Sequence, residues 1–102
     1  MKPMRWSAEK NRLLAVERGI TFERVVVAVE MGRLLDTMEH PNRQRYPNQR
    51  ILIVEIDGYA FVVPYVEEEE QIFLKTVIPS RKATRDYLGS KTGSEGADDE
   101  RA

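Results

Sequence analysis

The chain contains no cysteine and a single histidine, His40. It therefore has no disulfide framework, no thiolate nucleophile and no cysteine-ligated zinc, and one imidazole cannot build a histidine-rich metal site. No apolar run approaches the roughly 20 residues that a membrane span needs. The opening MKPMRWSAEK also lacks the apolar segment of a signal peptide. These absences predict a cytoplasmic protein with no metal and no cofactor.

The usual sequence signatures of several enzyme classes are missing too. There is no GxxxxGK[ST], no GxSxG, no HExxH and no glycine-rich dinucleotide loop, so nucleotide hydrolases, serine hydrolases of that type and zincins lose their signals. The 102 residues are 41% hydrophobic, which is enough for one compact domain and too little for two. A single domain without repeats is expected.

Charge is segregated along the chain, although the formal net charge is only −1. Cations gather in residues 1–12, 40–50 and 78–88, and acids gather in residues 67–70 and in the tail around residues 98–100. A near-neutral total argues against nucleic-acid binding. A segregated distribution can still present a positive face to a polyanion, provided that the basic segments meet in space.

Two helices are predicted near the start. Ser7 is a good N-cap for strong helix formers that end at Gly19, which predicts a helix over residues 8–18. Thr21 can cap a second helix over residues 22–35, because its apolar residues recur on one helical face. The three consecutive valines in that run leave open a buried strand, since β-branched residues lower helix propensity.

The rest of the chain reads mostly as strands. Asp57-Gly58 is a strong hairpin signal, and Pro64 is expected at a sheet edge or a bulge because it cannot donate to a ladder. Residues 41–49 read as a loop. Strand-like runs are expected at residues 34–40, 50–57, 59–66 and 71–79.

The chain closes with a short basic helix at residues 80–88. Beyond it the composition is serine, glycine and charge, so residues 89–102 are predicted to be a disordered acidic tail and residues 1–88 the compact domain. The expected fold is α+β, with the two N-terminal helices and the short C-terminal helix packed on one face of a three- to four-stranded antiparallel meander.

The remaining reactive groups suit cleavage of RNA by attack of a ribose 2′-OH on its adjacent phosphate. That reaction needs a base, an acid and cations that stabilise the phosphorane. Arg81 and Arg85 are four apart on one helical face and could hold one phosphate between them. Histidine as a residue type suits proton transfer near neutral pH, which makes His40 the first candidate proton carrier. Tyr87 is the alternative.

Lys10, Arg50 and Lys82 are the further cations predicted to bind substrate, and Tyr46 or Lys10 could also move protons. Each assignment has a structural rival. A basic last helix is commonly a solvated face whose cations stabilise the helix C-terminus. His40 also fits an ordinary loop residue, and Trp6 a core anchor better than a base-stacking platform.

Two end motifs resemble one known family. The opening MRWSAEKNRLLAVERGITFERV is similar to the start of the BrnT toxins, and VIPSRKATRDYL is similar to that family's closing ISARKAT and basic helix. The middle fits as well, with a loop around His40 and then Arg50 opening a strand. The resemblance covers residues 4–88. Matching positions are Trp6, Lys10, Asn11, Gly19, Ile20, Phe22, Glu23, Arg81, Lys82, Ala83, Thr84 and Arg85.

The resemblance implies a toxin of a type II toxin–antitoxin pair with a RelE-like fold. Such toxins are metal-independent endoribonucleases that inhibit translation, and a ribbon-helix-helix DNA-binding antitoxin neutralises them in a hetero-oligomer. Family members usually carry histidine where this chain has Arg18. A non-catalytic member that binds RNA or the antitoxin is therefore the alternative. A third possibility is a structural domain whose basic segments never meet.

Overall fold

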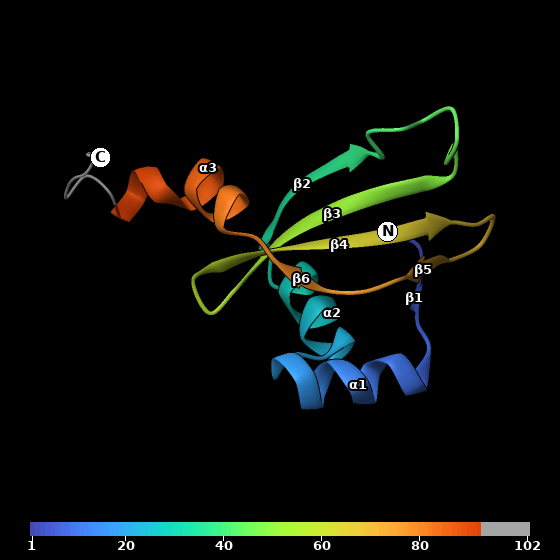
Figure 1. Cartoon of the computed structure of the whole chain (residues 1–102), viewed down its shortest axis with the longest axis horizontal. Helices are drawn as coiled ribbons and strands as arrows, with labels where there is room; N and C mark the ends of the chain where they lie inside the picture. The colour runs from blue at the N-terminus through green and yellow to red at the C-terminus, as the bar shows by residue number, and fades with distance from the viewer. Residues whose placement is uncertain (93–102) are drawn as a thin grey trace.

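The chain folds as an α+β protein, as predicted (Figure 1). The computed structural model describes the backbone of residues 1–92 and the side chains of residues 1–89. Its elements are β1 (Met4–Arg5), α1 (Ala8–Arg18), α2 (Phe22–Glu30), β2 (Leu34–Glu39), β3 (Gln49–Ile56), β4 (Tyr59–Glu67), β5 (Ile72–Leu74), β6 (Ile78–Pro79) and α3 (Arg81–Thr92).

The six strands form one sheet in the order β1-β5-β4-β3-β2, with β6 also paired to β4. All pairs are antiparallel except β1 with β5. The predicted hairpin between β3 and β4 is confirmed. Asp57 and Gly58 both have positive φ, 55° and 78°, which matches the strand twist as a type I′ turn does. The sheet has more strands than the three or four expected.

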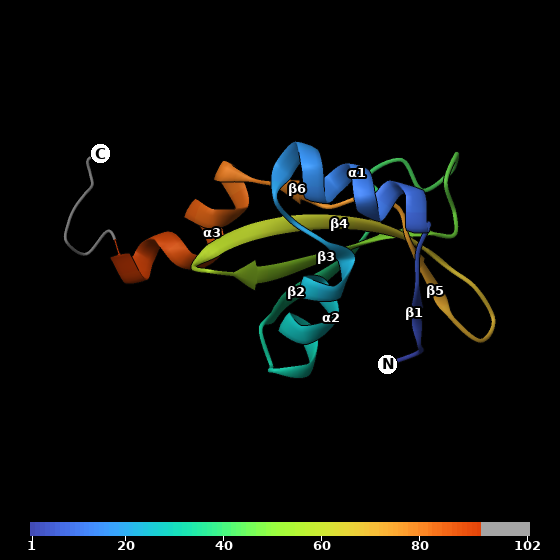
Figure 2. The same cartoon turned by 90° about the horizontal axis from the view of Figure 1, so that it is seen from below.

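The sheet is covered on both faces. On the first face, α1 and α2 bury Leu14, Phe22 and Val25 against β3 and β4 residues such as Leu52 and Val63, and we call this the α1–α2 face. Seen from below, these two helices lie in front of the strands (Figure 2). Strand residues alternate between faces, so the opposite face carries Ile51, Ile53, Ala60 and Val62.

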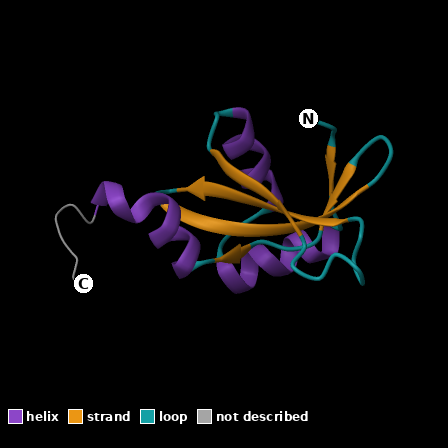
Figure 3. Cartoon of the chain, turned by 90° about the horizontal axis from the view of Figure 1, so that it is seen from above, coloured by secondary structure: helices purple, strands orange, loops and turns teal. Residues whose placement is uncertain are grey.

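Helix α3 packs on that opposite face, which we call the α3 face. Ala83 and Leu88 are buried there against Ile53 and Ala60. The prediction that the helices share one face is therefore wrong for α3. Viewed from above, α3 extends past the end of the strands (Figure 3). The two helical layers thus place the N-terminal motif and the C-terminal motif on different sides of the sheet.

Two predicted boundaries need correction. Helix α2 ends at Glu30, because Gly32 takes a left-handed conformation with φ 77° and turns the chain into β2. The valine run is helical. The single strand expected over residues 71–79 is two strands, β5 and β6, since residues 75–77 leave the sheet and Val77 turns into the core.

Pro64 lies in β4, which has neighbours on both sides, so the edge prediction is wrong. It sits between the part of β4 that pairs with β5 and the part that pairs with β6. There Val63 and Pro64 face the irregular residues 75–77, as at a bulge. The Pro64 carbonyl accepts a hydrogen bond from the Lys75 N–H at 2.8 Å, and this gap in the ladder requires no N–H from proline.

Helix α3 is longer than expected. It runs to Thr92, so residues 89–92 are helical instead of disordered, and the rest of the predicted acidic tail, residues 93–102, lies outside the described residues. Within residues 1–92, no helix is both long enough and apolar enough to cross a membrane.

Candidate functional site at the start of α3

The start of α3 is fixed by its own sequence. The Ser80 hydroxyl accepts a hydrogen bond from the Ala83 N–H at 3.0 Å, and the Ser80 carbonyl accepts one from the Thr84 N–H at 3.0 Å. Ser80 is therefore the N-cap. Arg81 and Lys82 become the first two helical residues, and Arg85 follows one turn later.

The cations of α3 do not lie where they would stabilise the C-terminus of the helix. Cations stabilise the C-terminal end of a helix, whereas Arg81, Lys82 and Arg85 lie in its N-terminal half, and the first turn holds no acid. Arg81 and Lys82, in the first turn, oppose the helix dipole at a cost of about 0.3 to 1 kcal/mol each for an exposed group, whereas Arg85 lies beyond the first turn. Helix stability does not explain them. A helix N-terminus reinforced by cations is a place that attracts anions.

We call these three side chains the α3 basic end. Arg81 makes no hydrogen bond or ion pair with any described residue. Lys82 Nζ lies 2.7 Å from Asp86 Oδ2, and Arg85 Nε lies 3.9 Å from Asp86 Oδ1. The hydrogen bond from Lys82 lowers the pKa of Asp86 below its ordinary value. Among the described residues, Arg81 thus has no partner, and Lys82 and Arg85 share one carboxylate.

Two hydroxyl groups hold α3 on the sheet. Thr84 Oγ1 accepts from the buried Ala60 N–H at 2.8 Å and donates to the Ser80 carbonyl at 2.8 Å. The Tyr87 hydroxyl donates to Asp36 of β2. This bond, together with burial, raises the pKa of Tyr87 above its ordinary value. The phenol keeps its proton near neutral pH and serves to dock the helix.

His40 lies away from α3. It follows the last residue of β2, where its N–H donates to the Gln49 carbonyl at 3.2 Å and its Nδ1 accepts from the Asn42 N–H at 3.0 Å. Its ring centroid is 4.6 Å from that of Tyr46. It lies four positions after Asp36, about 13 Å along a strand. The loop after β2 and helix α3 lie at opposite ends of the sheet (Figure 1).

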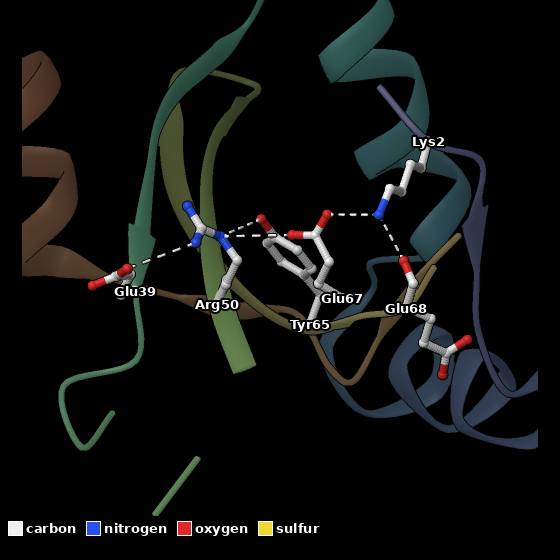
Figure 4. A network of polar contacts seen from close by, with 6 residues as sticks. All are labelled: Lys2, Glu39, Arg50, Tyr65, Glu67 and Glu68. Carbon is white, nitrogen blue, oxygen red and sulfur yellow. Dashed lines mark hydrogen bonds and ion pairs between the residues drawn. The ribbon is translucent and has the colours of Figure 1, made fainter. Parts of the chain in front are cut away.

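Arg50 is held in a network of its own on the α1–α2 face (Figure 4). Its Nε donates to the Tyr65 hydroxyl at 3.2 Å, and its guanidinium lies 3.9 Å from carboxylate oxygens of Glu39 and Glu67. Glu67 also pairs with Lys2 at 2.9 Å. The Tyr65 contact is the main cause that raises the pKa of Arg50. Two carboxylates already counter its charge, so Arg50 is a poor free phosphate ligand.

The predicted site residues therefore occupy separate places. Arg81, Lys82, Arg85 and Tyr87 share α3, His40 lies at the far end of β2, and Lys10 (on α1) and Arg50 lie on the α1–α2 side of the sheet. The three basic segments do not form one continuous patch. Among the predicted site residues, Arg81, Lys82 and Arg85 are the cations that share one element. Elsewhere Arg43 and Arg50 meet at Glu39, and Lys2 and Arg50 meet at Glu67.

Three matched residues of the N-terminal motif have a structural role, which the sequence indicated for Trp6 as a core anchor but not for Asn11 or Glu23. Asn11 Oδ1 accepts from the Phe22 N–H at 2.8 Å, and Asn11 Nδ2 donates to Glu23 Oε1 at 2.8 Å. Trp6 stacks on Phe22 with ring centroids 5.6 Å apart. These contacts fix α1 against α2. The sequence also did not indicate a contact made by Arg18. Its Nη1 donates to the carbonyl of Val77, a residue close in sequence to α3, at 2.7 Å.

The chain was compared with protein-family models, with curated proteins and with solved structures. None of them matches. A functional proposal for this chain therefore depends on the geometry of α3.

Asn11→Ala is expected to lower the free energy of unfolding by about 1 to 2 kcal/mol, because the N-terminal Phe22 N–H of α2 loses its acceptor. Urea unfolding measures the loss. Arg12→Ala, which changes an exposed neighbour on α1, is the matched control and should stay within about 0.5 kcal/mol of the wild type. Equal stability of Asn11→Ala and the control would contradict the role assigned to Asn11.

Proposed function

We propose that this chain is the toxin of a type II toxin–antitoxin pair that acts on RNA, and that the α3 basic end holds the phosphodiester backbone. One observation carries the proposal: three cations gather at the start of α3, and the two in its first turn, Arg81 and Lys82, oppose the helix dipole. Selection for stability would favour acids there. A bound polyanion turns the same arrangement into a favourable one.

The arrangement of Arg81 and Arg85 suits a phosphate group as the bound anion. Arg81 and Arg85 are one turn apart and project from the same side of α3. Two planar guanidinium groups can each donate two hydrogen bonds to phosphate oxygens and stay charged at every physiological pH. The capped N-terminus adds the partial positive charge of the helix. The resemblance of the RKAT segment to the closing motif of the BrnT toxins supports RNA as the polyanion.

Cleavage would proceed by attack of the 2′-oxygen on the adjacent phosphorus. The 2′-hydroxyl loses its proton to a base, the P–O5′ bond breaks, and the leaving 5′-oxygen takes up a proton. The products are a 2′,3′-cyclic phosphate and a 5′-hydroxyl. Arg81 and Arg85 would stabilise the charge that develops on the equatorial oxygens. This is the metal-independent endoribonuclease that the resemblance implies.

A non-catalytic RNA-binding member is the second candidate, and a specific observation favours it. None of the four candidate proton carriers stands free beside Arg81. His40 and Tyr46 lie together in the loop after β2, Lys10 lies on α1, and the Tyr87 hydroxyl donates to Asp36. Catalysis would need one of them to move on binding, or another group to transfer the proton. Binding needs neither.

Incubation of the purified protein with single-stranded RNA in EDTA distinguishes the candidates. Endoribonuclease activity predicts fragments that end in 2′,3′-cyclic phosphate, lost in Arg81→Ala and kept in Arg12→Ala. The non-catalytic candidate predicts a gel shift that depends on Arg81 with the RNA left intact. Absence of both cleavage and an Arg81-dependent shift at high protein concentration would refute the proposal.

The partner implied by this function is a ribbon-helix-helix DNA-binding antitoxin, with which the toxin forms a hetero-oligomer in the cytoplasm. Expression of the chain alone should then arrest growth. Arg81→Ala should relieve the arrest in a host that makes as much of the variant as of the wild type.

A further inference from the structure

We infer that Asp86 competes with RNA phosphate for Lys82 and Arg85, and so sets the affinity of the α3 basic end. The inference rests on the proposed function and goes one step beyond it. It names an acidic residue as the group that limits binding. In the absence of RNA, the Asp86 carboxylate occupies the cations that a phosphate would otherwise bind.

The contacts of Asp86 are those expected of a competitor. Its Oδ2 is 2.7 Å from Lys82 Nζ, and its Oδ1 is 3.9 Å from Arg85 Nε. One carboxylate thus engages two of the three cations. The side chains are exposed, with 78% of Lys82, 67% of Arg85 and 45% of Asp86 accessible. Exposed ion pairs are weak and exchange partners readily, so a phosphate can replace the carboxylate without a change in the fold.

Helix stability alone would favour the opposite order of this pair. An acid that precedes a base by four residues supports a helix, whereas the order here is Lys82 and then Asp86, the less favourable orientation. The opposite order would also complement the helix dipole. The observed order keeps the cation at the helix N-terminus and places the acid one turn further on, next to Arg85.

The consequence is an affinity below the highest that these cations allow. A phosphate that reaches Lys82 or Arg85 must first displace Asp86, and the displaced carboxylate then stands close to the phosphate and repels it. Arg81, which has no partner among the described residues, makes the first contact at no such cost. Removal of the Asp86 charge should leave the fold intact and strengthen binding.

The test compares Asp86→Asn with the wild type for binding to a short fluorescein-labelled single-stranded RNA, measured by anisotropy over a salt series. The affinity of Asp86→Asn should rise by up to about fivefold at low salt. The plot of log affinity against log salt should also become steeper by up to about one unit, because one more phosphate contact forms. Thermal unfolding checks that the variant folds.

Glu9→Gln is the matched control, since it removes one negative charge from the exposed surface of α1, away from α3. Unchanged affinity in Asp86→Asn would overturn the inference, and so would an equal gain in Glu9→Gln, which would reflect net charge alone. Arg81→Ala distinguishes failure of the inference about Asp86 from failure of the proposed function. If Arg81→Ala weakens binding but Asp86→Asn has no effect, only the inference fails; if Arg81 is also without effect, the proposed function fails with it.

Discussion

Replacing Arg81 with glutamate is expected to stabilise the fold and, at the same time, to abolish most of the RNA binding. Arg81 is the first residue of α3 and makes no hydrogen bond or ion pair with a described residue. Glutamate there replaces a charge that opposes the helix dipole with one that complements it, a gain of about 1 kcal/mol. The loss of one charge-assisted contact to phosphate costs about 1.5 to 3 kcal/mol of binding, roughly 10- to 100-fold in affinity.

The expected gain in stability and loss of RNA affinity distinguish this prediction from its alternatives. A loss of binding through misfolding would lower stability as well, whereas a purely structural Arg81 would leave RNA affinity unchanged. Thermal unfolding and RNA anisotropy on the same sample decide between them. An increase in melting temperature without loss of RNA affinity would show that the α3 basic end is not the RNA contact.

A charge swap supplies the second control. In K82D/D86K the net charge and the i,i+4 pair are kept, but the acid now lies at the helix N-terminus and the base lies one turn later. The fold should again gain stability. RNA affinity should fall, because the cation has left the helix N-terminus. Equal binding by the swapped protein would mean that RNA senses only the total charge of α3.

Local signals allowed much of the fold to be predicted from the sequence. Ser7 and Gly19 bound α1 as expected, because the N-cap hydroxyl and the left-handed C-cap act within one turn. The Asp57-Gly58 hairpin was equally local. The parallel pairing of β1 with β5 could not be predicted, since a two-residue strand has no periodicity and its partner lies far along the chain.

The candidate site divides in the same way. The shared face of Arg81 and Arg85 follows from helical spacing alone. The distance between His40 and Tyr87 does not follow from the sequence, because it depends on where α3 docks on the sheet. The same holds for Arg50, whose two acidic neighbours come from β2 and from the end of β4. Cations that look alike in the sequence are therefore distinguished by their partners in the fold.

Thr84→Val is expected to lower the free energy of unfolding by about 2 kcal/mol, a large effect for the loss of a single hydroxyl. Valine keeps the shape of the side chain but removes the oxygen that accepts from the Ala60 N–H and donates to the Ser80 carbonyl. Ala60 is fully buried. A buried donor left without an acceptor costs about 1 to 3 kcal/mol.

The same substitution links the docking of α3 to the proposed function. The Thr84 hydroxyl accepts from the Ala60 N–H, and the Ala60 carbonyl accepts from the Ser80 N–H. These two bonds attach the N-cap of α3 to the central strand β4. In Thr84→Val the amides of residues 81–89 should exchange faster with solvent, and RNA affinity should fall although no cation has changed. Thr84→Ser keeps the hydroxyl and should retain most of both. Full RNA affinity in a Thr84→Val protein whose α3 exchanges freely would show that RNA binding does not require the docked helix.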